Sequence, residues 1–191
     1  MYCGDANDTS PSASATNRIM TYYKTLVQGY VGLNAPPSPQ DKLFACPSDR
    51  FHYWVNASGA PVFVPRGRCE EALAYYSSYA FNGINNQVTN FPTPANGSHP
   101  GISGRKLSSI KHPDKTVLVS EQSAIFPFSW HRPKRPVSDP TNSFFNDAKD
   151  MVSFVAGNIS YIKIYWNSQT GTLPTTFYDP PAGYDYQWSG D

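Results

Sequence analysis

The stretch MVSFVAGNISYIKIYW, residues 151–166, carries the strongest secondary-structure signal in the chain. Its second half alternates in side-chain character, so Ile162, Ile164 and Trp166 share one face of a strand, and we expect that face to be core. The intervening Ala156-Gly157-Asn158 has the composition of a tight turn. We therefore predict that the two halves pair as an antiparallel hairpin.

Further strand candidates precede this hairpin and alternate with clusters of turn residues. Short strands in such a series are typical of antiparallel β structure rather than of βαβ units. The candidate strands are 51–55, 61–64, 76–81, 116–121, 151–155 and 159–166.

One amphipathic helix is predicted ahead of the strands, over about residues 16–31. Gly32 lies near its expected end, and the Pro-Pro-Ser-Pro run at 36–39 prevents its continuation. The apolar residues with helical spacing are Ile19, Tyr23, Leu26, Val27 and Tyr30. The expected fold class is therefore α+β, with an N-terminal helix packed on an antiparallel sheet that has long loops.

The two ends of the chain differ in composition. Residues 1–15 are small and polar without periodicity, which predicts a flexible arm. Residues 16–191 then form a single globular domain. Its last part, 171–191, is rich in proline, glycine and aromatic residues, so we expect an irregular tail that docks through its rings.

The overall composition excludes several classes of partner. The 191 residues include 18 proline and 13 glycine, and 15% are charged, against about 25% in typical globular domains. A formal net charge of +1 removes the electrostatic case for nucleic acid or an anionic membrane surface. No apolar run approaches the length of a membrane-spanning helix, and the start of the chain lacks the pattern of a signal peptide.

The cysteines leave two interpretations open. Cys46 and Cys69 enclose a loop full of turn residues, and a disulfide between them would add about 3 kcal/mol of stability in an oxidising compartment. Two small buried thiols are the alternative. Local spacing does not indicate a zinc site, because the chain has no CxxC or HxxxH pair and its four histidines are scattered.

The C-terminal loop carries a candidate calcium site. Asp179, Asp185 and Asp191, together with backbone carbonyls, could supply the six to eight oxygen ligands that calcium takes. The spacing matches no EF-hand, and solvated carboxylates are the alternative interpretation.

Aromatic residues could instead form a binding surface. Trp130, Trp188, Tyr184 and Tyr186 are the candidates for a platform that stacks on sugar rings or contacts a partner. The alternative is that most of these rings are core, since the chain has few leucines with which to fill an interior.

A hydrolytic site is the third class considered. Ser129, His131 and Glu121 could meet as a triad, although no serine lies in a Gly-x-Ser-x-Gly turn. Glu121 follows an apolar strand, and a carboxylate in apolar surroundings needs partners. We therefore expect Glu121 to join a local hydrogen-bond network.

Five pieces of sequence occur in an order that resembles a known family. They are Leu43–Asp49, Ser77–Gly83, Ile110–Pro113 leading to Val117–Glu121, Phe144–Lys149, and Val152–Phe154 continuing to Trp166. Together they resemble the globular part of the bacterial prepilin-type proteins of the planctomycete and verrucomicrobial lineages, which are relatives of type IV pilins and type II secretion pseudopilins.

The resemblance implies a non-enzymatic structural subunit or surface module of a pilus-like or type II secretion-like assembly. The implied location is the bacterial cell envelope, periplasmic or extracellular. The implied partners are other pilin-like subunits, which in that family pack through an N-terminal apolar helix that this chain does not carry. Major pseudopilins hold calcium in a C-terminal loop, which adds to the calcium prediction.

The chain departs from the family in its hairpin. Where relatives commonly have Phe-x-Asp-Gly-His, this chain has Phe154-Val155-Ala156-Gly157-Asn158. The turn glycine is present, whereas the carboxylate and the imidazole are not. These positions therefore cannot perform whatever those two groups do in relatives.

Overall fold

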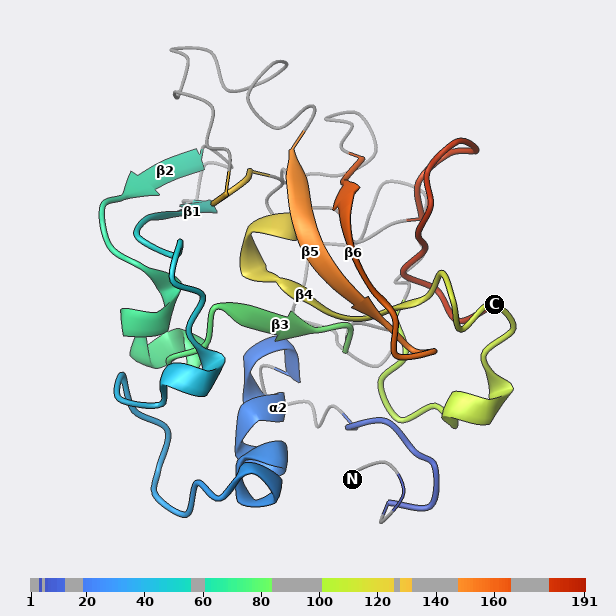
Figure 1. Cartoon of the computed structure of the whole chain (residues 1–191), viewed down its shortest axis with the longest axis horizontal. Helices are drawn as coiled ribbons and strands as arrows, with labels where there is room; N and C mark the ends of the chain where they lie inside the picture. The colour runs from blue at the N-terminus through green and yellow to red at the C-terminus, as the bar shows by residue number, and fades with distance from the viewer. Residues whose placement is uncertain are drawn as a thin grey trace.

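The computed structural model describes residues 4, 6–12, 19–55, 61–83, 101–125, 128–131, 148–165 and 179–191. The described residues combine one short α-helix, labelled α2 (Ile19–Val27), with antiparallel sheets, and strands predominate among them (Figure 1). The predicted mixture of helix and antiparallel sheet is confirmed.

The larger sheet has four strands in the order β3-β4-β5-β6, and each neighbouring pair is antiparallel. The strands are β3 (Tyr79–Phe81), β4 (Val117–Glu121), β5 (Lys149–Phe154) and β6 (Ile159–Lys163). Figure 1 shows β5 and β6 running side by side as the longest pair. β4 lies between β3 and β5 in the sheet, so residues at its end lie in the interior of the molecule.

The predicted hairpin is confirmed as β5 and β6. Val152 lies opposite Ser160, and the Phe154 N–H donates to the Asn158 carbonyl at 2.9 Å across the turn. Gly157 has a φ of 90°, in the left-handed region that favours glycine. Ile164 is buried as expected, whereas Trp166 lies outside the described residues.

A second sheet contains two strands. β1 (His52–Val55) pairs antiparallel with β2 (Pro61–Val64), with His52 opposite Val64. The bounds of β2 match the predicted strand 61–64, and β1 begins one residue later than predicted.

The predicted helix appears as α2 (Ile19–Val27), continued by a 3-10 turn over Gln28–Val31. It ends at Gly32, whose φ of 78° closes the last turn. Tyr23 on α2 contacts Phe81 of β3, with ring centroids 6.4 Å apart. No helix in the described part of the chain is both long and apolar enough to cross a membrane.

β3 is shorter than the predicted strand 76–81. Tyr75 and Tyr76 have φ values of 49° and 53°, so the backbone is left-handed immediately before the strand. Ser77 then bonds Tyr79 through its hydroxyl, which accepts from the Tyr79 N–H. The strand therefore begins only at Tyr79. Hydrogen bonds from Lys24 to the carbonyls of Tyr75 and Tyr76 explain this backbone conformation.

Apolar side chains form three clusters. One lies between α2 and β3 and includes Tyr23 and Phe81, and a second surrounds Tyr53, Phe128 and Trp130. The third cluster contains Val117, Val152, Phe154, Ile164, Tyr186 and Trp188. The C-terminal segment 179–191 thus docks on the sheet through two of its rings, as expected from its composition.

The N-terminal residues 6–12 run along the segment 102–108. The Ser10 N–H donates to the Arg105 carbonyl at 2.9 Å, and an Asp8 oxygen accepts from the Ser108 N–H at 2.9 Å. This part of the expected arm is therefore hydrogen-bonded to the domain.

Candidate functional site

A buried carboxylate lies at the end of the inner strand β4. Glu121 is 1% exposed, and its Oε2 accepts a hydrogen bond from the Met151 N–H of β5 at 2.9 Å. Its Oε1 lies within reach of the side chains of His131 and Cys46. The prediction that Glu121 joins a hydrogen-bond network is confirmed.

His131 connects this carboxylate to the solvent. Its Nε2 lies 2.7 Å from Glu121 Oε1, and its Nδ1 lies 3.4 Å from Ser48 Oγ. The Tyr161 ring stands edge-on to the imidazole, with centroids 6.0 Å apart. The His131 side chain is 37% exposed, so the imidazole links the buried Glu121 carboxylate to the solvent.

Cys46 completes the cluster from the interior. Its Sγ lies 3.5 Å from Glu121 Oε1 and 3.9 Å from His131 Nε2. Burial is the main reason that the pKa of the Cys46 thiol is raised to about 11. The carboxylates of Glu121 and Asp49 also raise this pKa, whereas the hydrogen bond from the Ser48 backbone N–H lowers it. In this arrangement Cys46 is a protonated thiol at neutral pH and therefore a poor nucleophile.

Asp49 holds together the two loops that carry Cys46 and Cys69. Its carboxylate accepts from the N–H groups of Arg68 at 2.8 Å and Cys69 at 2.9 Å, and from Ser78 Oγ at 2.6 Å. Ser78 Oγ in turn accepts from the Cys46 N–H at 2.8 Å. A side chain at Gly67 would collide with the Asp49 carbonyl, so the loops that carry Gly67 and Asp49 approach as closely as a glycine allows.

The cluster brings together the three classes of ligand atom that transition metals use in proteins. A sulfur, a nitrogen and an oxygen lie within 4.8 Å of one another, and among the described residues this is the one such group of His, Cys, Asp or Glu side chains. Two of the three residues are buried and one is exposed. The arrangement can hold a cation with one side facing solvent.

The predicted hydrolytic triad forms in part. His131 and Glu121 meet, but Ser129 Oγ bonds the Tyr161 hydroxyl at 3.1 Å rather than the imidazole. Cys46 lies beside the pair in place of Ser129. The sequence did not favour this triad, because no serine lies in a Gly-x-Ser-x-Gly turn, and the Ser129 side chain lies toward Tyr161 of β6.

The three aspartates proposed for calcium do not converge. Asp179 accepts from the N–H groups of Trp188 and Ser189, and Asp191 pairs with Arg105 at 2.9 Å. Asp185 lies apart on the surface. Asp179 and Asp191 therefore already have protein partners. Among the described residues, the three aspartates do not form a group whose oxygen atoms lie close enough together to hold a metal ion.

Of the two alternatives for Cys46 and Cys69, the structure has the free thiols. Cys46 Sγ faces Glu121 and His131, whereas Cys69 Sγ lies 4.0 Å from the Asp49 carbonyl. The Asp49 framework, rather than a covalent bridge, joins the two loops.

The proposed aromatic platform is also mostly interior. Trp130, Trp188 and Tyr186 are 3%, 4% and 3% exposed, so their faces are packed against other side chains rather than available to a sugar ring. The Trp130 indole N–H donates to the Phe51 carbonyl at 2.7 Å. Three of the four candidates therefore act as core, and Tyr184 alone among them is partly exposed.

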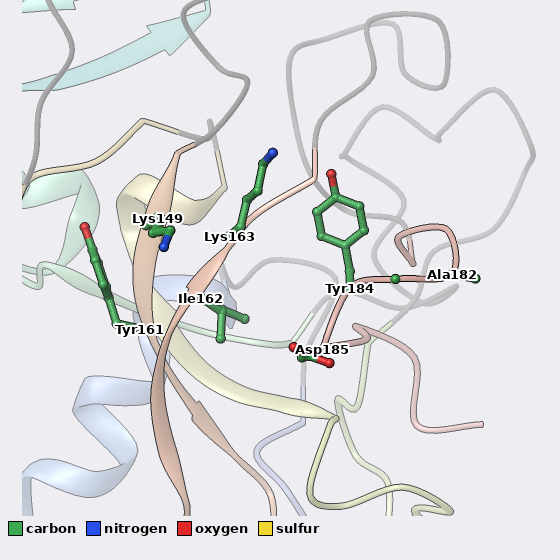
Figure 2. Close-up of a pocket in the computed structure, with 8 residues that line it drawn as sticks. Lys149, Tyr161, Ile162, Lys163, Ala182, Tyr184 and Asp185 are labelled. Carbon is green, nitrogen blue, oxygen red and sulfur yellow. The ribbon is translucent and has the colours of Figure 1, made fainter.

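A surface hollow of about 460 Å³ lies between the β5–β6 pair and the C-terminal segment. Figure 2 shows Lys163 of β6 and Tyr184 of the C-terminal segment on facing sides of it. Asp185 also lines this hollow, so two sequence-predicted residues share one surface. Its charged residues are exposed, and solvated surface charges do not by themselves define a ligand.

No sequence pattern predicted that Cys46 lies beside Glu121 and His131. Cys46 is 75 residues from Glu121 and 85 from His131, so no local spacing pattern contains the cluster. A partial signal was available, since Glu121 and His131 were both singled out for the triad.

Comparison with known protein families, with curated proteins and with solved structures finds no match for this chain.

Proposed function

We propose that the chain is a non-enzymatic structural subunit or surface module of a pilus-like or type II secretion-like assembly in the bacterial cell envelope. Its fold in this proposal is pilin-like, with a helix packed on an antiparallel sheet. The contact between Tyr23 of α2 and Phe81 of β3 supports that arrangement.

The observation that carries the proposal is the way the resembling segments bind one another. The Ser78 N–H donates to the Phe44 carbonyl at 2.8 Å, and the Gln122 N–H donates to the Ser78 carbonyl at 2.8 Å. Ser78 Oγ donates to Asp49. Two segments that carry the resemblance, Leu43–Asp49 and Ser77–Gly83, are thus joined at Ser78, and the residue that follows Val117–Glu121 bonds the same serine, which supports an architectural role for this region.

The state of the candidate nucleophiles supports the non-enzymatic part of the proposal. Burial raises the pKa of Cys46 to about 11, and the Ser129 hydroxyl is hydrogen-bonded to that of Tyr161. A lowered pKa is one way in which a nucleophile is activated, and the pKa of Cys46 is shifted in the opposite direction. The Cys46 thiol instead donates to the Glu121 carboxylate.

In-cell cross-linking tests this function. Cells that produce the protein are treated with formaldehyde, and envelope fractions are probed with an antibody to the chain. We expect a ladder of species containing two or more subunits, which disappears when the cross-links are reversed by heating. A protein recovered solely as a monomer after cross-linking would contradict the proposal.

An activity assay addresses the hydrolase alternative. The purified chain is incubated with peptide and ester substrates beside its His131→Ala variant. We expect the two proteins to give the same background rate. Turnover that disappears in the His131→Ala variant would overturn the non-enzymatic assignment.

A further inference from the structure

We propose that Cys46, Glu121 and His131 form a binding site for zinc, with the fourth coordination position open to solvent. The site is independent of the proposed assembly role. Its basis is the geometry of three side chains, the chemistry of their ligand atoms and the residues that hold them.

The distances between the ligand atoms fit a zinc ion. Cys46 Sγ lies 3.5 Å from Glu121 Oε1 and 3.9 Å from His131 Nε2, and these last two atoms are 2.7 Å apart. The point equidistant from the three atoms is about 2.0 Å from each, close to a zinc–nitrogen or zinc–oxygen bond and shorter than the zinc–sulfur bond of about 2.3 Å. A tetrahedral ion needs ligand atoms about 3.4–3.6 Å apart, so the His131–Glu121 pair must open by about 0.7 Å and give up its hydrogen bond. The exposed His131 side chain has room for this movement.

The donor set selects the class of metal. A cysteine sulfur, an imidazole nitrogen and a carboxylate oxygen suit zinc, whereas calcium and magnesium take oxygen ligands almost exclusively. Binding replaces two contacts by metal–ligand bonds: the S–H···O contact of Cys46 and the hydrogen bond between His131 Nε2 and Glu121 Oε1. The thiol proton is released to solvent, and the neutral imidazole keeps its one proton on Nδ1, beside Ser48 Oγ. Zinc also carries no redox change, so the site needs no electron donor or acceptor.

Neighbouring groups orient each ligand, as metal sites require. Ser48 Oγ lies against His131 Nδ1, on the side of the ring away from the cluster. The Met151 N–H holds Glu121 Oε2, which leaves Oε1 directed at the other two ligands. Ser78 Oγ fixes the backbone of Cys46.

Burial supplies both a pocket and an entrance. Cys46 and Glu121 are 4% and 1% exposed, while the His131 side chain is 37% exposed. An ion can therefore enter beside the imidazole and keep a water ligand there. Three protein ligands with one open position are the pattern of accessible rather than fully closed zinc sites.

Cobalt spectroscopy tests the site directly. Cobalt(II) takes the same ligands as zinc and absorbs when it is bound by thiolate in a tetrahedral site. The chelator-treated chain is titrated with cobalt and then with zinc. We expect one cobalt per chain, a thiolate–cobalt absorption band, and loss of the band as zinc displaces cobalt.

Variants assign the signal to its residues. We expect Cys46→Ala and His131→Ala to lower cobalt affinity by more than about 100-fold, and Ser48→Ala by about 10-fold. His131 and Ser48 lie near the surface, so these two variants test the site even if Cys46→Ala fails to fold. Calcium should leave the spectrum and the melting temperature unchanged.

Matched controls separate this site from other thiols and imidazoles. Cys69→Ala removes the neighbouring free thiol and His112→Ala removes an exposed imidazole, and we expect both to keep the band. A titration without a thiolate–cobalt band would overturn the proposal. A band that persists in Cys46→Ala or in His131→Ala would overturn it equally, because the metal would then lie elsewhere.

Discussion

Two polar clusters differ in whether they reach the solvent. In the first, Lys24 is 0% exposed and its Nζ lies 2.8 Å from Asp41 Oδ2. The same ammonium donates to the carbonyls of Tyr75 at 3.0 Å and Tyr76 at 3.2 Å, and lies over the Phe44 ring. Each of its three protons has an acceptor, so this cluster is closed.

The second cluster is open. Cys46, Glu121 and His131 place one sulfur, one oxygen and one nitrogen within 4.8 Å of one another, and the imidazole borders solvent. The comparison shows that burial of charge has two outcomes. A cation with three protein acceptors fixes the fold, whereas three converging ligand atoms with an exposed edge can take an ion from solution.

The closed cluster also explains an unusual backbone. Tyr75 and Tyr76 are consecutive residues with positive φ, a conformation that costs about 1–2 kcal/mol for each L-residue. Both carbonyls accept from Lys24 as a result. The buried ammonium thus stabilises the turn that precedes β3.

The largest effect should come from breaking the closed pair. Asp41→Asn leaves the buried Lys24 without its counter-charge, and we expect a loss of about 3–5 kcal/mol in the free energy of unfolding. Urea denaturation measures this loss. Lys24→Met combined with Asp41→Asn should lose less than Asp41→Asn alone, because no unpaired charge remains.

A matched exposed lysine calibrates this measurement. Lys42 lies close in sequence to Asp41 on the surface, and Lys42→Met should change stability by less than about 0.5 kcal/mol. Equal stability of Asp41→Asn and the unaltered chain would show that the closed cluster does not support the fold.

A smaller loss of stability should follow when the hydrogen bonds of Asp49, which hold the loops of Cys46 and Cys69 together, are removed. Asp49→Ala leaves the Ser78 hydroxyl and the Arg68 and Cys69 amides without their acceptor, at an expected cost of about 3 kcal/mol. Thermal and urea unfolding measure this cost, with the exposed Asp114→Ala as control. An unchanged stability would mean that the cysteine loop holds its position without Asp49.

The pH dependence of stability should also distinguish the closed cluster. Burial raises the pKa of Asp41, but Lys24 and the Ser38 N–H outweigh it and hold the pKa below its ordinary value of 3.8. A lowered folded pKa means that this stability is present above the unfolded pKa and lost as pH falls through the folded one. We therefore expect steepening acid destabilisation below about pH 4.

The variant with both Lys24→Met and Asp41→Asn tests the source of that slope. It should show a shallower loss of stability over the same acid range, measured by urea denaturation at each pH. Identical slopes for this variant and the unaltered chain would assign the acid sensitivity to other carboxylates.

The smallest effect is expected at the C-terminal carboxylates. Asp191 is 76% exposed in its ion pair with Arg105, and exposed pairs contribute little. Asp191→Asn should change stability by less than about 0.5 kcal/mol. Calcium should not raise the melting temperature, and a rise that Asp191→Asn removes would restore the calcium prediction.

The elements that the sequence predicted are those with local causes. Residues 159–163 alternate in character, and Gly157 supplies the turn, so the hairpin follows from a few neighbouring residues. α2 follows from the spacing of its apolar face, and the 3-10 turn that continues it ends at Gly32. Strand 76–81 was predicted too long, because its start depends on a contact with Lys24 that lies far away in sequence.

The candidate site was predicted in fragments. Glu121 was expected to need partners and His131 was considered beside it, and the two meet at 2.7 Å. For Cys46 the sequence left a disulfide and a buried free thiol open, because loop composition and cysteine spacing contain no information on which way a thiol faces. Ser129 failed as the third member for the same reason.

By itself the sequence determined the helix, the hairpin, the antiparallel class and the need to fill the interior with rings, because periodicity and turn chemistry act over a few residues. The tertiary structure alone decided which polar groups share an interior. The pairing of β3 with β4 and β4 with β5 brings Glu121 beside the cysteine loop and His131, across separations that no local pattern spans. Packing likewise buried Lys24, because the backbone of Tyr75 and Tyr76 could turn its carbonyls toward that charge.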